Sequence, residues 1–232
     1  MADRPPGGQT TLIGGENRRG MTENAKKSFL SQAWLVLLLA ICFGALLAGM
    51  QITLGPTIEA NKINETLERV PEIVFGKARA RELSDRQQAV DITPQNVAVE
   101  KAGKTVRYNV YKTEADGRLA GWVAKTAGQG YADKIEMLVG FDPMVREITG
   151  IFVLEQKETP GLGNKIVTEE WRSQFAAKPT DEPLTAVKGK AKADNEIDAI
   201  TGATISAKAV TDIINTAVRD LRDPLAAKAK GQ

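Results

Sequence analysis

The longest apolar run of the chain lies near its N-terminus. Residues 33–54 contain no charged side chain, and extended back to Phe29 the run reaches about 26 residues, more than the roughly 20 that a helix needs to cross a bilayer. It is too long for the core of a cleaved signal peptide and has no small-x-small cleavage site at its end. Cys42 does not complete a lipid-attachment box, because Ile41 stands where a small residue is expected. The pattern predicts an uncleaved transmembrane helix over residues 29–54, with Cys42 as a small apolar residue facing lipid or another helix.

Positive charge differs between the two sides of this span. Within about 20 residues, the N-terminal flank has more basic side chains than the C-terminal flank: Arg18, Arg19, Lys26 and Lys27 against Lys62 and Arg69. The bias favours a cytoplasmic N-terminus and an extracytoplasmic folded part. Residues 1–28 are rich in Gly, Pro and Arg and lack apolar periodicity, so they are predicted to form a disordered cytoplasmic tail.

A helical period follows the span. Between Pro56 and Pro71, apolar residues recur at near-helical spacing: Ile58, Ile63, Leu67 and Val70. Proline is common in the first turn of a helix and ends one further along. This pattern predicts a juxtamembrane helical stem within residues 55–90.

Strand signals begin around Val97, and a half-buried strand has an apolar period of two. Residues 105–111 alternate in this way, and Asp116-Gly117 predicts a hairpin turn into residues 119–125. A second hairpin pairs residues 134–141 with 145–154. The simplest arrangement of these strands is antiparallel.

Helical signals return in the C-terminal part. Thr168 is a candidate N-cap, with Trp171 and Phe175 four residues apart on one face. A last helix is predicted from Ser206, its N-cap, to Leu221, with an apolar stripe along it. The fold class is therefore α+β, an antiparallel sheet with flanking helices. The folded domain covers residues 91–221, and residues 222–232 form a C-terminal tail.

Composition limits the chemistry. The formal net charge of +2 gives no sign of a nucleic-acid partner. The chain has no histidine and one cysteine, which excludes Ser-His or Cys-His catalysis, histidine-ligated haem, Cys or His zinc sites and an intrachain disulfide. No strand-linked G-x-G-x-x-G indicates a nicotinamide dinucleotide site. Any redox chemistry therefore needs an organic cofactor.

Two segments are candidates for a binding site. In DAITGATIS, residues 198–206, Thr204 lies at a helix entrance where unpaired amides favour a phosphate, while Gly202 and Ala203 leave the backbone open. The other reading is a plain turn into a helix. In LEQKETPGLGNKI, residues 154–166, Pro160, Gly161 and Gly163 surround Leu162 and predict a tight loop, which could equally be a strand-to-helix connection.

Together the two segments are specific. ETPGLGNKI at residues 158–166, followed by DAITGAT at residues 198–204, resembles the flavin-binding domain shared by the G subunit of the Rnf electron-transport complex and the C subunit of the sodium-translocating NADH:quinone reductase. The resemblance also covers the N-terminal span and GYADKIEMLVGFD at residues 130–142. The GLGNKI loop and the short connection between the motifs are more similar to the Rnf protein. Gln156 departs from the histidine common in relatives, which puts in doubt any role assigned to that position.

This resemblance implies a set of functional residues. Thr204 corresponds to the residue that bears FMN through a phosphoester, as an anchor and not a catalyst. The matching cofactor-binding positions are Thr201, Gly202, Ala203, Glu158, Thr159, Leu162 and Gly163. Asp198 corresponds to a position recognised by the flavin transferase, which uses FAD outside the cytoplasm.

The implied protein is a single-pass subunit of the bacterial inner membrane that transfers electrons within an ion-translocating ferredoxin:NAD+ oxidoreductase. Its partners are the other integral-membrane Rnf subunits, and it is not active alone. Two alternatives remain open: the C subunit of a quinone reductase, and a membrane-anchored scaffold without flavin. The identity of the co-purifying subunits distinguishes a quinone reductase from an Rnf complex. The absorbance of the purified chain shows whether it carries flavin, which a scaffold would not.

Overall fold

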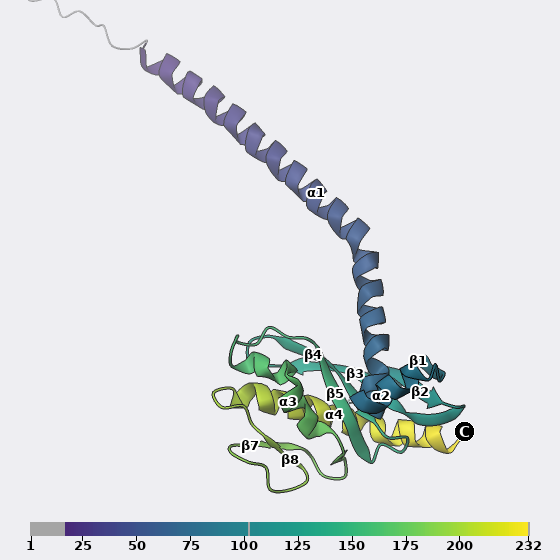
Figure 1. Ribbon diagram of the computed structural model, residues 1–232. Helices are drawn as coiled ribbons and strands as arrows, with labels where there is room; N and C mark the ends of the chain where they lie inside the picture. Colours follow the sequence, from purple (N-terminus) through teal and green to yellow (C-terminus); the bar gives the residue numbers. More distant parts are fainter. Residues whose placement is uncertain (1–16, 102, 232) are drawn as a thin grey trace, which may run out of the picture. The chain divides into compact units, whose positions relative to one another are not determined.

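The computed structural model describes residues 17–101 and 103–231, and the chain divides into two units at Ala60 (Figure 1). The described part of the first unit, residues 17–60, belongs to helix α1 (Asn17–Phe75) and contains the stretch Ala33–Gly55, which has a mean hydropathy of 2.5 and the length needed to cross a membrane. Of the predicted disordered tail, residues 1–16 lie outside the described residues. Residues 17–28 are helical, so the prediction was wrong for them, because the prolines of the tail all precede Asn17.

Helix α1 runs without a break past Pro56 and Pro71. The sequence predicted that a separate stem helix would start at the first of these prolines and end at the second. A proline inside a helix removes one amide hydrogen bond. At Pro71 the burial of Val70, Ile73 and Val74 against the sheet compensates for that loss. Helix α2 (Lys77–Asp85) follows after Gly76, so the predicted stem comprises the end of one helix and a second short one.

Six strands form the main sheet in chain order, each antiparallel to the next. They are β1 (Val90–Lys101), β2 (Lys104–Ala115), β3 (Arg118–Gln129), β4 (Lys134–Phe141), β5 (Glu147–Glu155) and β6 (Lys178–Pro179). The turn at Asp116-Gly117 has positive φ at both residues, 51° and 71°, as the hairpin prediction requires. The first strand begins seven residues before Val97. A small parallel pair, β7 (Thr185–Val187) and β8 (Glu196–Asp198), lies outside this sheet.

The helices that follow β5 are short until the last. The 3-10 helix η1 (Gly163–Val167) leads into α3 (Glu169–Arg172) and the 3-10 helix η2 (Ser173–Phe175). Thr168 caps α3 as predicted, since its side chain accepts a hydrogen bond from the Trp171 amide at 3.4 Å. The α+β class is confirmed.

Helix α4 spans Thr204–Lys230, which corrects the sequence prediction at both ends. It begins two residues before Ser206, the predicted N-cap. It also continues through residues 222–230, expected to be a tail, because Leu225 extends the buried stripe and is fully buried. Pro224 lies inside the helix without ending it.

The sheet is covered on both faces. Since neighbouring strand residues point to opposite faces, Trp122 and Met137 belong to a cluster with α4, whereas Val123 and Leu138 belong to a second cluster with residues 70–74 of α1. In Figure 1, α4 runs along the sheet. Glycines in the sheet leave room for α4 on one face and for α1 on the other. A Cβ at Gly128 of β3 would lie 2.5 Å from Ile213 of α4, and one at Gly140 of β4 would clash with Ile73.

A buried polar network joins the C-terminal half of α4 to the first two strands. The Tyr108 hydroxyl donates to Asp220 Oδ2 at 2.7 Å, and Lys101 Nζ lies 3.0 Å from the same oxygen. Burial alone would raise the pKa of Asp220, but the hydrogen bonds from Tyr108 and Lys101 and the lysine charge outweigh it, so this pKa lies below its usual value. Burial and the Asp220 carboxylate raise the pKa of Tyr108.

Replacing Asp220 is expected to destabilise the domain at neutral pH. Asp220→Ala leaves the buried Tyr108 hydroxyl without its acceptor, at a cost of about 1–3 kcal/mol. Because the folded-state pKa is depressed, the ionised carboxylate stabilises the fold above about pH 4, and this contribution is lost as the pH falls through the folded pKa. Unfolding of both proteins in mild detergent, followed by circular dichroism at pH 7 and pH 3, measures the difference. Asp212→Ala, at an exposed position of the same helix, is the control, and an equal loss in both variants would contradict the prediction.

Candidate functional site

A cavity of about 750 Å³ opens at the N-terminus of α4. Its volume lies in the range of small-molecule and cofactor sites. All but two of the residues predicted for the site line it: Thr159, Leu162, Gly163, Thr201, Gly202, Ala203 and Thr204. The structure therefore brings the two candidate segments together around one cavity.

The loop at residues 159–163 is tight because one backbone carbonyl accepts hydrogen bonds from two backbone amides. The Thr159 carbonyl accepts from Leu162 N at 3.1 Å and from Asn164 N at 3.2 Å, which turns the chain directly into η1. The side chain of Leu162 reaches the second segment, where a Cβ at Gly202 would lie 3.0 Å from Leu162 Cδ2. Gly202 has φ +82°, a conformation that glycine adopts without strain.

The start of α4 presents unpaired donors to the cavity. Thr204 is the first helical residue, and Ala203 at the N-cap has no side chain that could cap the helix. The amides of the first turn have no partner within a helix and form its positive end. Among the described residues no hydrogen bond involves the Thr204 hydroxyl. The helix start thus combines backbone donors, a free hydroxyl and a favourable potential for an anion.

Ser206 has a different role from the one predicted. Its side chain is buried, and its hydroxyl donates to Glu158 Oε2 at 2.5 Å instead of capping the helix. The side chain of Glu158 is 3% exposed and lies behind the cavity wall, not at its surface. Gln156, whose role the sequence left open, accepts a hydrogen bond from the Glu158 amide at 2.6 Å.

Asp198, the second predicted residue outside the cavity lining, holds the neighbouring loop. Its Oδ1 accepts from the Ala191 amide at 2.5 Å, and its carbonyl accepts from Trp171 Nε1 at 2.8 Å. These bonds connect β8 to α3 and to residues 188–191. Asp198 Oδ2 has no partner among the described residues.

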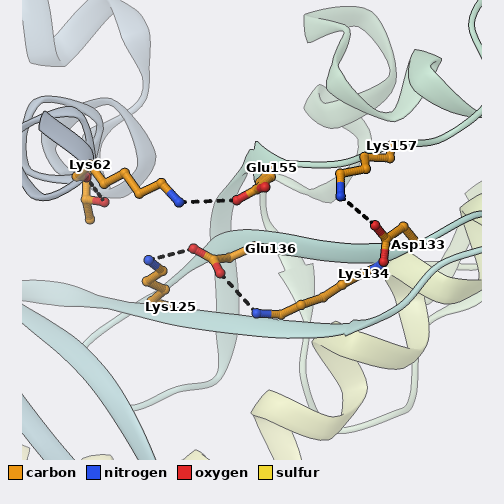
Figure 2. A network of polar contacts seen from close by, with 8 residues as sticks. Lys62, Lys125, Asp133, Lys134, Glu136, Glu155 and Lys157 are labelled. Atoms are coloured by element: carbon orange, nitrogen blue, oxygen red, sulfur yellow. Dashed lines mark hydrogen bonds and ion pairs between the residues drawn. The ribbon is translucent and has the colours of Figure 1, made fainter. Parts of the chain in front are cut away.

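Several lining residues were not predicted from the sequence, and the two of most chemical interest are Tyr131 and Lys188. Tyr131 lies in the turn between β3 and β4 and is 62% exposed, unusual for an aromatic side chain. An ion pair joins this turn to the segment before Glu158, with Lys157 Nζ 2.9 Å from Asp133 Oδ2 (Figure 2). Lys188 is the only charged residue among those described in the lining. In the sequence, the available signals for these two residues were a tyrosine in GYAD, residues 130–133, and a lysine in KGK, residues 188–190.

Comparison with known proteins agrees with this geometry. A family model described as an FMN-binding domain matches residues 130–219, which include both cavity loops and most of α4. The G subunit of the Na(+)-translocating ferredoxin:NAD(+) oxidoreductase complex of Acetobacterium woodii is 34% identical over 187 residues, 80% of this chain and 87% of that protein. The chain belongs to the Rnf G-subunit family.

Other relatives support the membership. The G subunit of the ion-translocating oxidoreductase complex of Pasteurella multocida is 30% identical to this chain. The match covers 83% of this chain and 93% of that subunit. Among solved structures, NqrC of Shewanella oneidensis matches with a TM-score of 0.62 and 20% identity, over 75% of this chain and all of that one. The Rnf G-subunit family and NqrC therefore share a fold, as the sequence motifs predicted.

Proposed function

We propose that this protein is the FMN-bearing electron-transfer subunit of an Rnf-type ion-translocating oxidoreductase. The observation on which the proposal depends is the position of Thr204, whose hydroxyl is free at the open start of α4 and lines the cavity of about 750 Å³. A phosphoester at Thr204 would put the phosphate beside the unpaired amides of the first helical turn. The flavin would then occupy the cavity.

The cavity residues fit the parts of FMN. The amides at the start of α4 and the ammonium group of Lys188 complement the negative charge of the phosphate group. Gly202 and Ala203 keep the approach to Thr204 uncrowded, and Thr201 lies on the same turn. Leu162 and Tyr131 offer apolar surface to a flat ring. Bound FMN supplies the ability to accept and donate electrons, which the chain's own side chains do not provide.

Maturation requires an enzyme that attaches the flavin. We propose that a flavin transferase recognises the segment from Asp198 to Thr204. The free Oδ2 of Asp198 and the exposed Thr201 and Gly202 are accessible for that recognition. Thr204 itself is half-buried and lines the cavity, so a flavin attached there would lie next to its binding site.

The Ala33–Gly55 stretch is proposed to anchor the protein in the inner membrane with its N-terminus in the cytoplasm. Its residues are 0% buried within the described chain, as expected for a helix surrounded by lipid or by other subunits. The basic residues on the N-terminal flank favour this orientation. The FMN-binding domain would therefore be extracytoplasmic.

Removing the Thr204 hydroxyl is expected to abolish covalent flavin. Thr204→Ala lacks the oxygen of the phosphoester, whereas Thr204→Ser keeps it and should retain at least part of the flavin fluorescence of the denatured protein on a gel. Thr201→Ala, the matched control on the same turn, should keep the anchor. The fold should persist in all three, since an exposed or half-exposed turn substitution costs well under about 1 kcal/mol. A folded Thr204→Ala protein as fluorescent as the parent would refute the anchor, and a parent chain without flavin absorbance would favour a scaffold.

The orientation can be tested with a reporter enzyme that requires a disulfide for activity, because disulfides form outside the cytoplasm. Fused after Gln232, the reporter is expected to be active. Fused ahead of Met1, it should be inactive. The reverse pair of results would put the domain in the cytoplasm.

The assembly is tested by purification from the native membrane. In mild detergent we expect the chain to co-purify with other integral-membrane subunits, since its apolar helix has small residues such as Gly44 and Gly49 that let helices approach closely. The identity of those subunits distinguishes an Rnf complex from a quinone reductase. Recovery of the chain as a lone monomer would contradict the proposal.

A further inference from the structure

A buried carboxylate lies directly behind the cavity wall. Glu158 is 3% exposed, and each of its oxygens accepts one hydrogen bond: Oε2 from the Ser206 hydroxyl at 2.5 Å and Oε1 from the Ala132 amide at 3.1 Å. Burying a carboxylate is costly. A side chain of this kind with no contact in the cavity calls for an explanation other than ligand binding.

Two glycines hold the carboxylate close to the cavity. A Cβ at Gly163 would lie 2.7 Å from Ser206 Oγ and 2.9 Å from Glu158 Oε2, and one at Gly130 would clash with Glu158 Oε1. Gly163 and Ser206 both line the cavity. The charge of Glu158 is therefore separated from the cavity by a single layer of residues without a bulky side chain.

The surroundings of Glu158 solvate its charge without cancelling it. Ser206 is the third residue of α4, so the carboxylate lies beside the positive end of a long helix, and two donors point at its oxygens. Among the described residues no Lys or Arg forms an ion pair with it. Its neighbour Lys157 pairs with Asp133 instead, and Figure 2 shows that pair.

We infer that Glu158 tunes the electron affinity of the flavin held in this cavity, its fixed negative charge making the flavin harder to reduce. An electron that enters the flavin adds negative charge unless a proton accompanies it. A fixed anion one residue layer away, itself buried from water, opposes that addition. Glu158 is not among the residues that line the cavity, so it acts by its field. This inference rests on the proposed function.

The test is a redox titration of the full-length flavin-loaded protein in detergent, produced together with a flavin transferase, with absorbance as the readout. Glu158→Gln keeps the size and the hydrogen-bonding capacity of the side chain but removes its charge. At a fixed applied potential near the parent's midpoint, we expect its ratio of reduced to oxidised flavin to rise about tenfold. Glu158→Asp keeps the charge in a shorter side chain and should remain within about threefold of the parent.

The two variants separate charge from packing. If Glu158 were only structural, the shorter Asp would disturb the flavin more than the isosteric Gln, and that order would overturn the inference. Glu170→Gln removes an exposed acidic side chain on α3 and should leave the ratio unchanged. Circular dichroism and flavin absorbance are recorded first, so that only folded, loaded proteins are compared.

A second variant keeps the inference testable if Glu158→Gln does not take up flavin. Gln156→Lys puts a positive charge on the side chain that contacts the Glu158 backbone amide, while the carboxylate is retained, and it should also raise the ratio of reduced to oxidised flavin. A ratio within about twofold of the parent in whichever variant is loaded would overturn the inference. A parent chain that acquires no flavin would refute the proposed function instead.

Discussion

The close approach of α4 to β3 is the contact on which the functional site depends. Gly128 leaves room for Ile213, and a fully buried stripe that includes Val210, Ile214 and Leu221 fixes the helix along one face of the sheet. A buried side chain of that size contributes about 1.5–3 kcal/mol. Because the helix is rigid, fixing its middle also fixes its first residue. Thr204 is thus positioned in part by packing about two to five turns further along the helix.

This geometry explains how a site with a single charged side chain in its described lining can bind an anion. The cavity has one charged residue in its described lining, Lys188, and its other lining residues are uncharged, so the backbone amides at the helix start add much of the positive potential. Backbone amides keep their position without the entropy cost of ordering a long side chain. The buried pair of Glu158 and Ser206 joins the start of α4 to the loop at residues 159–163, so both walls of the cavity are fixed to each other.

The sequence predicted those features that depend on local pattern. The apolar stretch, the two hairpins, the turn at Asp116-Gly117 and the cap at Thr168 follow from short-range physics, and the structure agrees with each. Ser206 was assigned wrongly, since a serine near a helix start normally caps it, whereas here a carboxylate 48 residues earlier in the chain competes for its hydroxyl. Pro71 and Pro224 did not end their helices, because tertiary packing outweighs one lost hydrogen bond.

The candidate site was predicted unevenly for a similar reason. Its two motif segments could be found from the resemblance to known flavin-binding domains, and they do line one cavity. Tyr131 and Lys188 could not, because each is a single residue in a turn whose position depends on the assembled sheet.

The end of α1, which follows the apolar span, is part of the folded domain. Val70, Ile73 and Val74 cover Tyr111, Val123 and Leu138 on the face of the sheet opposite α4. The folded unit that includes the sheet therefore begins near Asn61 and not at the first strand. Amide hydrogen exchange in this part of α1 should follow global unfolding of the domain.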